Sequence, residues 1–183
     1  MFGANCIKKH NPLPFVIRSE CPGDYNDILH LTYKAFMTLN YPGRLRLDEH
    51  FLISLIQNSP FIIPELCFVA TIHENDKKNE KIVGHIFYTK SKVRQANGTE
   101  INTITFGPLS VDPEYQRQGI GVALILHSIN KAREFGFGAV LIVGVPDYYI
   151  KLGFKRAREY CLQLSDGTAD ESFMAYELML HLI

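Results

Sequence analysis

Two glycines separated by one residue stand where a strand-like segment gives way to a helix-like one, in the loop Gln116–Gly121. The first N–H groups of a helix have no partner within the helix and carry the positive end of its dipole, so they favour an anion. Glycine has no Cβ that would keep a phosphate away, and Arg117 adds a positive charge at the rim. The loop therefore predicts a phosphate-binding site, with a plain strand–helix turn as the alternative.

Two common nucleotide-binding motifs do not fit this loop. A Walker loop continues with Gly-Lys-Ser/Thr, whereas Gly121 is followed by Val122 and Ala123. A dinucleotide fingerprint needs a third glycine and an acidic residue at the end of the next strand, and neither Leu124 nor Val143 provides one. The loop is expected to bind another kind of phosphate-bearing ligand.

The elements that must position this loop follow from the spacing of apolar residues. Helical spacing predicts helices over residues 24–39, 48–57 and 119–135 and a short helix over 148–152. Apolar or alternating segments predict strands over residues 15–18, 66–72, 81–89, 101–111, 139–143, 158–164 and 173–178. This order indicates an α/β (α+β) fold built on one mixed sheet.

The composition fits a single soluble domain that spans residues 1–183. The formal net charge is zero, which argues against nucleic acid as the main partner. No apolar run is long enough to span a membrane, and residues 1–14 do not resemble a secretory signal. The scattered cysteines have neither metal-ligand spacing nor the density of a disulfide framework, so we expect no metal and a cytoplasmic location; they are Cys6, Cys21, Cys67 and Cys161.

Two blocks of the sequence together resemble the GNAT superfamily of acyl-CoA-dependent N-acetyltransferases. The segment Leu109–Gly121 is similar to the coenzyme A signature Gln/Arg-x-x-Gly-x-Gly/Ala and the strand before it. The segment Tyr148–Phe154 resembles the Tyr-x-x-x-Gly-Phe element at the expected distance downstream. The lead-in Gly144–Tyr149 is similar to a bacterial subgroup of predicted acetyltransferases.

The resemblance implies acetyl-CoA as the co-substrate and a mostly antiparallel central sheet flanked by helices. The strand ending at Val111 and the strand over 139–143 would splay apart around the coenzyme. Pantetheine would pair with the backbone of Leu109 and Val111, as an added strand does. The implied coenzyme-binding residues are Leu109, Ser110, Val111, Gln116, Arg117, Gln118, Gly119, Ile120, Gly121 and Val122.

The resemblance also implies direct attack of a primary amine on the thioester in a ternary complex. Tyr149 is the implied general acid, because a phenol with a pKa of about 10 keeps its proton at neutral pH and can give it to a thiolate. Tyr148 is interpreted as packing or as a wall of the substrate site. Some relatives use a glutamate base where this chain has Thr105, which is no base. That leaves a water chain or another side chain, and His85 is the candidate because its pKa lies near neutrality.

The acceptor is expected to be a small-molecule or peptide amine. Its groove would run along residues 36–59 and the hairpin over 95–102. Arg44 and Arg46, in the first of these ranges, either favour an acidic acceptor or belong to a solvated loop, and the sequence favours the solvated loop. The C-terminal strand offers a way to pair across a homodimer. The missing acidic base leaves an alternative function, a non-catalytic module that binds acyl-CoA as a sensor or scaffold.

Overall fold

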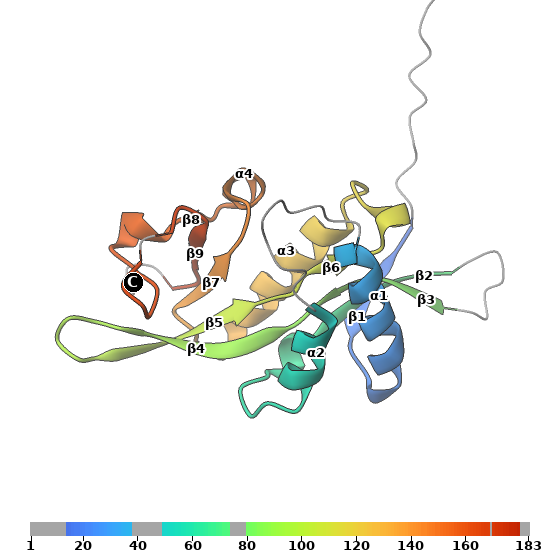
Figure 1. The fold of residues 1–183 in the computed structure, drawn as a ribbon, viewed down its shortest axis with the longest axis horizontal. Coiled ribbons are helices and arrows are strands. Elements are labelled where there is room, and N and C mark those ends of the chain that lie inside the picture. Colours follow the sequence, from blue (N-terminus) through green and yellow to red (C-terminus); the bar gives the residue numbers. More distant parts are fainter. Residues whose placement is uncertain (1–13, 38–48, 74–79, 169, 180–183) are drawn as a thin grey trace, which may run out of the picture.

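The structure is a computed structural model that describes residues 14–37, 49–73, 80–168 and 170–179 (Figure 1). The helices of this part are α1 (Tyr25–Met37), α2 (Glu49–Gln57), α3 (Ile120–Ala132) and α4 (Pro146–Tyr149). The strands are β1 (Val16–Ser19), β2 (Phe68–His73), β3 (Glu80–Ile86), β4 (Tyr88–Arg94), β5 (Glu100–Phe106), β6 (Ser110–Val111), β7 (Ala139–Val143), β8 (Lys155–Arg156) and β9 (Phe173–Glu177).

The strands form two hydrogen-bonded sheets, in the orders β1-β2-β3-β6 and β4-β5-β7-β9-β8. The pairings within the described residues are antiparallel except that of β5 with β7. The predicted fold class, an α/β fold with mostly antiparallel strands flanked by helices, is confirmed. The sheet expected to be continuous is divided in two.

The division arises because two long predicted strands each break in the middle and change sheets. The strand predicted over 81–89 breaks at Phe87, and the one predicted over 101–111 breaks at the cis peptide bond between Gly107 and Pro108. The N–H of Gly107 donates to the carbonyl of Phe87 at 3.4 Å, so the two breaks lie opposite each other. Proline has no N–H for a ladder, which makes a break there natural. As a result β6 and β7 lie in different sheets, which confirms the predicted splay.

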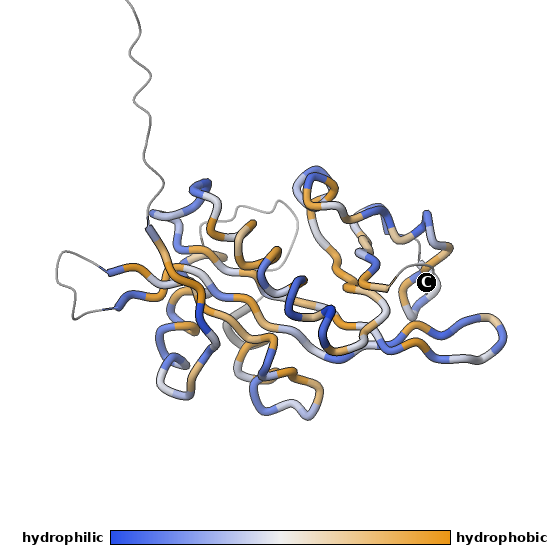
Figure 2. Tube along the Cα trace, turned by 180° about the vertical axis from the view of Figure 1, so that it is seen from behind, coloured by the Kyte–Doolittle hydropathy of each residue, from blue (hydrophilic) through white to orange (hydrophobic). Residues whose placement is uncertain are grey.

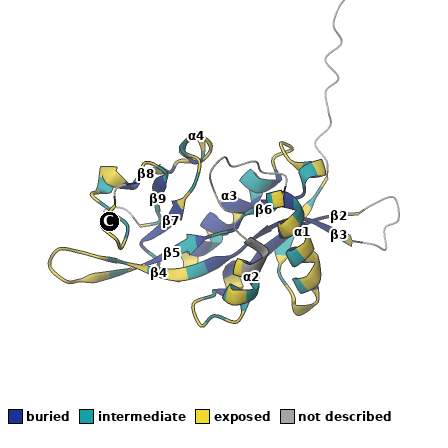
Figure 3. Ribbon diagram, in the orientation of Figure 1, coloured by how far each residue is buried: buried dark blue, intermediate teal, exposed yellow. Residues whose placement is uncertain are grey.

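Helices cover both faces of the first sheet. Helices α1 and α2 pack on one face, and α3 covers the opposite face and reaches onto the second sheet, so that the strands between them are buried (Figure 3). Gly84 lies directly beneath α3, because a Cβ there would stand 2.7 Å from Ile120 Cγ2 and 3.0 Å from Leu124 Cδ1. A larger residue would overpack this contact. Gly84 therefore sets the distance between α3 and the sheet, and with it the position of the loop before α3.

The chain after α4 differs most from the prediction. Residues 158–164 do not form a strand. Residues 158–160 belong to the 3₁₀ turn Ala157–Tyr160, and residues 161–164 belong to the loop after it. Their apolar side chains pack on the second sheet, so the alternation reflects one-sided burial rather than strand pairing. Strand β9 lies between β7 and β8, and β8 pairs with it only at Met174 and Ala175. Leu39, Arg44 and Arg46 lie outside the described residues.

The remaining predicted helices and strands are present, with boundaries that differ by a few residues. Seen from behind, the central strands are largely hydrophobic, whereas the far end of the β4–β5 hairpin is largely hydrophilic (Figure 2). Within the described ranges, no helix is both long enough and apolar enough to cross a membrane.

Arg18 on β1 ties the start of α1 to the first sheet. Its guanidinium donates to the two carboxylate oxygens of Asp24 at 2.6 and 2.9 Å and to Glu80 at 2.9 Å. Asp24 also accepts a hydrogen bond from the backbone N–H of Cys21 at 2.8 Å. The hydrogen bond from Arg18 lowers the pKa of the buried Asp24 carboxyl to about 2.

We expect the Arg18–Asp24 pair to govern acid stability. Because the pKa of Asp24 is depressed in the folded state, its contribution is complete above the ordinary carboxyl pKa of about 4 and is lost as the pH falls towards about 2. Asp24→Asn should lower the free energy of unfolding at neutral pH by roughly 2 kcal/mol and should flatten the loss between about pH 4 and about pH 2. Urea unfolding across this range measures both effects. The exposed Asp27→Asn is the control, and equal acid sensitivity of all three proteins would contradict the assignment.

Candidate active site

The loop between β6 and α3 is fixed at its base by Asp112. Its Oδ1 accepts a hydrogen bond from the backbone N–H of Glu114 at 3.0 Å and so caps the 3₁₀ turn Pro113–Tyr115. Lys34 on α1 binds the same carboxylate at 3.0 Å. This ion pair and hydrogen bond raise the pKa of Lys34. The start of the loop is therefore tied both to its own turn and to α1.

The second half of the loop has backbone conformations that suit an anion. Arg117 and Gly119 both lie in the left-handed region, with φ of 60° and 88°, and α3 begins at the next residue, Ile120. The start of α3 adds the unpaired N–H groups of its first turn, which favour an anion. Nothing lies within 4 Å of a Cβ added at Gly119, so glycine is required there by the backbone conformation.

Strand β6 presents an open edge beside this loop. Among the described residues it pairs only with β3, and the N–H of Asp112 donates to the carbonyl of Val83 at 2.9 Å. Because outward and inward groups alternate along an antiparallel strand, the N–H and carbonyl of Val111 point away from β3. The side chain of Gln116 donates to that carbonyl at 3.1 Å, which places it on the open side. The predicted backbone pairing at Val111 therefore has the free groups that it needs.

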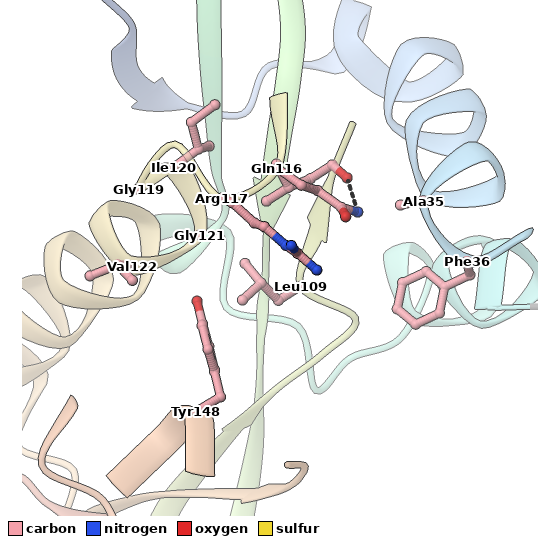
Figure 4. Close-up of a pocket in the computed structure, with 11 residues that line it drawn as sticks. Ala35, Phe36, Leu109, Gln116, Arg117, Gly119, Ile120, Gly121, Val122 and Tyr148 are labelled. Atoms are coloured by element: carbon pink, nitrogen blue, oxygen red, sulfur yellow. Dashed lines mark hydrogen bonds between the residues drawn. The ribbon is translucent and has the colours of Figure 1, made fainter. Parts of the chain in front are cut away.

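A cavity of about 300 Å³ lies between this edge, α1 and α4 (Figure 4). Eight of the ten predicted coenzyme-binding residues line it: Leu109, Val111, Gln116, Arg117, Gly119, Ile120, Gly121 and Val122. The side chains of the other two turn elsewhere. Ser110 is buried and lies 2.9 Å from the hydroxyl of Thr32, and Gln118 donates to the carbonyl of Glu114.

The two adjacent tyrosines of α4 take different positions. Tyr148 lines the cavity, and its hydroxyl lies 3.0 Å from where a Cβ on Gly121 would be (Figure 4). Partial burial raises the pKa of Tyr148, which keeps its phenol protonated. Tyr149 does not line the cavity but lies behind it, with its ring 6.0 Å from that of Phe106 and 5.5 Å from that of Phe154. Its ring also lies against Gly144, where a Cβ would stand 2.4 Å from Cε2.

His85 lies beneath α1 and α2, away from the cavity. Its side chain is 1% exposed, and its Nε2 lies 3.0 Å from Glu20 Oε2. Glu20 in turn accepts a hydrogen bond from Gln57 of α2 at 2.9 Å, while Nδ1 of His85 is buried without a hydrogen-bond partner in the structure. The structure therefore does not bring His85 together with the residues of the loop.

Two cavity residues of α1, Ala35 and Phe36, were not predicted for the coenzyme site, although Phe36 begins the range expected to line the acceptor groove. They reach the cavity because α1 crosses β6, where the hydroxyls of Thr32 and Ser110 meet. A contact between segments so far apart in the chain depends on tertiary packing rather than on a motif. In the described part of the chain, no cluster of three or more His, Cys, Asp or Glu side chains could hold a metal ion.

Comparison with known proteins adds a family to this geometry. The acetyltransferase (GNAT) family model matches residues 29–154. The uncharacterised N-acetyltransferase YhbS of Escherichia coli K12 is 26% identical over 98 residues, which cover 54% of this chain. The match spans 57% of the length of that curated relative.

Solved structures share the fold over most of the chain. The crystal structure of Escherichia coli YhbS in complex with CoA has a TM-score of 0.74 and 26% identity, and the match covers 92% of this chain and 84% of YhbS. A GNAT family acetyltransferase from Brucella melitensis in complex with acetyl-CoA has a TM-score of 0.66 and 24% identity, with 90% and 88% covered. The second likeness concerns the fold alone.

The buried contact between Glu20 and His85 yields a prediction about stability. Glu20→Ala would leave Nε2 of His85 and the amide of Gln57 without their partner, so the free energy of unfolding should fall by about 1–3 kcal/mol. Chemical denaturation measures the change. Glu65→Ala, at an exposed carboxylate on the neighbouring 3₁₀ turn, should change it by less than about 0.5 kcal/mol. Similar losses in both variants would show that the contact has no special role.

Proposed function

The chain belongs to the acetyltransferase (GNAT) family, and from this premise we propose that it transfers the acetyl group of acetyl-CoA to a primary amine. The loop Gln116–Gly121 carries the proposal. The first turn of α3, whose N–H groups have no partner within the helix, begins beside Gly119, Ile120 and Gly121, which line the cavity. This arrangement suits the phosphates of a coenzyme. We take residues 1–183 as a single domain with this function.

The neighbouring residues suit the rest of the same ligand. The outward N–H and carbonyl of Val111 offer a strand-like edge to the amide groups of pantetheine, and Leu109 and Tyr148 provide an apolar wall. Gln116 occupies the carbonyl of Val111 and would have to turn away as the ligand pairs there. We propose Leu109, Val111 and residues 116–122 as the coenzyme site, with Ser110 and Gln118 contributing through their backbone. The structure of YhbS in complex with CoA supports this choice of ligand.

The proposed reaction is a direct transfer within a ternary complex. Acetyl-CoA would supply a thioester, whose carbonyl carbon a neutral amine attacks, so that an amide forms and the carbon–sulfur bond breaks. A backbone N–H near Val111 would donate to the developing oxyanion. Tyr149 is the proposed general acid for the leaving thiolate. The proposal rests on its position in the Tyr-x-x-x-Gly-Phe element and not on the cavity lining, to which Tyr148 contributes instead. The acceptor is proposed to be a small-molecule or peptide amine.

The base that takes the proton from the amine is proposed to be either water or His85. Thr105, at the position where some relatives have a glutamate, lies beside Leu141 where β5 pairs with β7, and its hydroxyl is no base at neutral pH. His85 is the side-chain candidate, but its burial beneath α1 and α2 would prevent direct contact with the amine. That burial favours water as the base.

A calorimetric titration with acetyl-CoA tests the site. The parent protein should bind with a dissociation constant on the order of micromolar, and Gly119→Glu should weaken binding at least ~10-fold, because it strains a residue at positive φ and adds a negative charge beside phosphates. Gly167→Glu is a matched control, since Gly167 also has a positive φ of 80° and nothing within 4 Å of an added Cβ. Absence of binding to the parent would overturn the proposal.

Thiol release from acetyl-CoA with a panel of amines separates catalysis from mere binding. If Tyr149 is the general acid, Tyr149→Phe should lower kcat by about 10²-fold or more while leaving coenzyme binding and folding intact, because the ring still fills its site beside Phe106 and Phe154. Tyr148→Phe is the matched control and should keep kcat within a few fold. Equal kcat in the parent and Tyr149→Phe would refute that role. Coenzyme binding without release for any amine would favour the alternative, a non-catalytic acyl-CoA sensor.

A further inference from the structure

The second sheet has an open edge at β4, on the far side of β5 from the other strands. Strand β4 pairs with β5 on one side, and on the other side only its first residues have a partner. There, Ile63 donates to the carbonyl of Tyr88 at 3.0 Å, and Lys90 donates to the carbonyl of Phe61 at 2.8 Å. Beyond Lys90 the edge carries no backbone partner among the described residues. Figure 3 shows the outer half of this hairpin as largely exposed.

The direction of the free groups follows from the pairing. Since the N–H of Lys90 points outward to Phe61, the N–H groups of Lys92 and Arg94 point outward as well, because the pattern repeats every second residue. Lys92 and Arg94 stand opposite Asn102 and Glu100, in pairs that exchange no backbone hydrogen bonds. The open edge therefore offers donors and acceptors roughly 7 Å apart, the repeat that an added strand matches.

The side chains along this edge are basic. Lys90, Lys92 and Arg94 are exposed and share one face of the strand, since they lie two residues apart. Glu100 binds Lys92 at 2.6 Å and Arg94 at 3.2 Å, and Lys90 has no ion pair within the described part of the chain. Three cations thus face one carboxylate. Lysines on an open edge keep other basic edges away, but they leave it accessible to an acidic strand.

A second cavity, of about 500 Å³, lies on the same face beside this edge. Phe61 and Phe137 provide its apolar walls, and Lys90, Lys92 and Asn102 provide its polar side. Phe61 stands opposite Lys90 and is 60% exposed, so its ring lies where the chain leaves the edge of β4. The volume of this second cavity falls within the range typical of ligand pockets.

We propose that an extended acidic peptide segment of a partner protein adds as a strand to β4 beyond Lys90. Its backbone pairs with the outward N–H and carbonyl groups of Lys92 and Arg94. Its alternate carboxylates meet the three basic side chains, and an apolar side chain enters the cavity between Phe61 and Phe137. This surface is separate from the coenzyme cavity, because the two share no lining residue.

Fluorescence anisotropy with a labelled short peptide in which glutamate and valine alternate tests the proposal on the full chain. The parent protein should bind this peptide, and the same peptide with alternate backbone nitrogens methylated should bind at least ~10-fold more weakly, because it cannot form the ladder. Lys90→Glu combined with Lys92→Glu should weaken binding at least ~10-fold. A lysine–valine peptide should not bind.

A pair of substitutions at one residue separates the backbone from the charge. Lys92→Gln removes the charge, whereas Lys92→Pro removes the charge and also an N–H that β5 does not use, so the β4–β5 ladder stays intact. Lys92→Pro should therefore bind the peptide at least ~3-fold more weakly than Lys92→Gln. Equal affinities of this pair, or equal binding of the methylated peptide, would show a purely electrostatic contact and overturn the proposal. Absence of binding, or self-association that Lys92→Pro abolishes, would also overturn it.

Discussion

The opposed breaks at Phe87 and at Gly107–Pro108 are the constraint on which the rest of the structure depends. At this point two antiparallel strands leave one sheet together and enter another, linked by the hydrogen bond from Gly107 to Phe87. If the second strand ran on without a break, β6 would stay in line with β5 and beside β7. Instead β5 pairs with β7, while β3 is the one strand of the described chain that pairs with β6. The free backbone of Val111 and the cavity beside it both follow from that change of sheets.

Helix α3 packs on both sheets across this division, and two glycines set its position. Gly84 lets Ile120 and Leu124 rest directly on β3, and the left-handed Gly119 turns the chain into the helix immediately before Ile120. The same residue that contacts the core, Ile120, also lines the cavity. The direction of the first N–H groups of α3 is therefore fixed by core packing, and ligand binding would not have to supply that order.

The sequence predicted the order of the main elements and most of the cavity, because both are written in local patterns. The two glycines of Gln116–Gly121 predict the phosphate-binding loop, and the helical spacing of apolar residues predicts α3. The division at Phe87 was not predicted, because residues 82–88 contain no clear turn signal. They are all buried, and their largely apolar sequence is typical of one continuous strand. His85 and Tyr149 illustrate the other limit. Residue type suggested chemistry for His85, and its place in the Tyr-x-x-x-Gly-Phe element suggested it for Tyr149. Distant segments bury both side chains: Glu20 and Gln57 lie against His85, and Phe106 lies against Tyr149.

The two open strand edges differ in how they are protected, and this difference bears on what each can bind. At β6 the carbonyl of Val111 is covered by the neutral side chain of Gln116, which can turn away without leaving a buried charge. At β4 the protection is electrostatic, from Lys90, Lys92 and Arg94, and Glu100 is the one carboxylate in the described part of the chain that pairs with them. A neutral amide ligand suits the first edge because only hydrogen bonds are exchanged there. An uncharged strand would gain little at the second edge, whereas an acidic one would gain both the ladder and the ion pairs. The two edges thus have the same backbone pattern, and the partners proposed for them differ in charge because the neighbouring side chains differ.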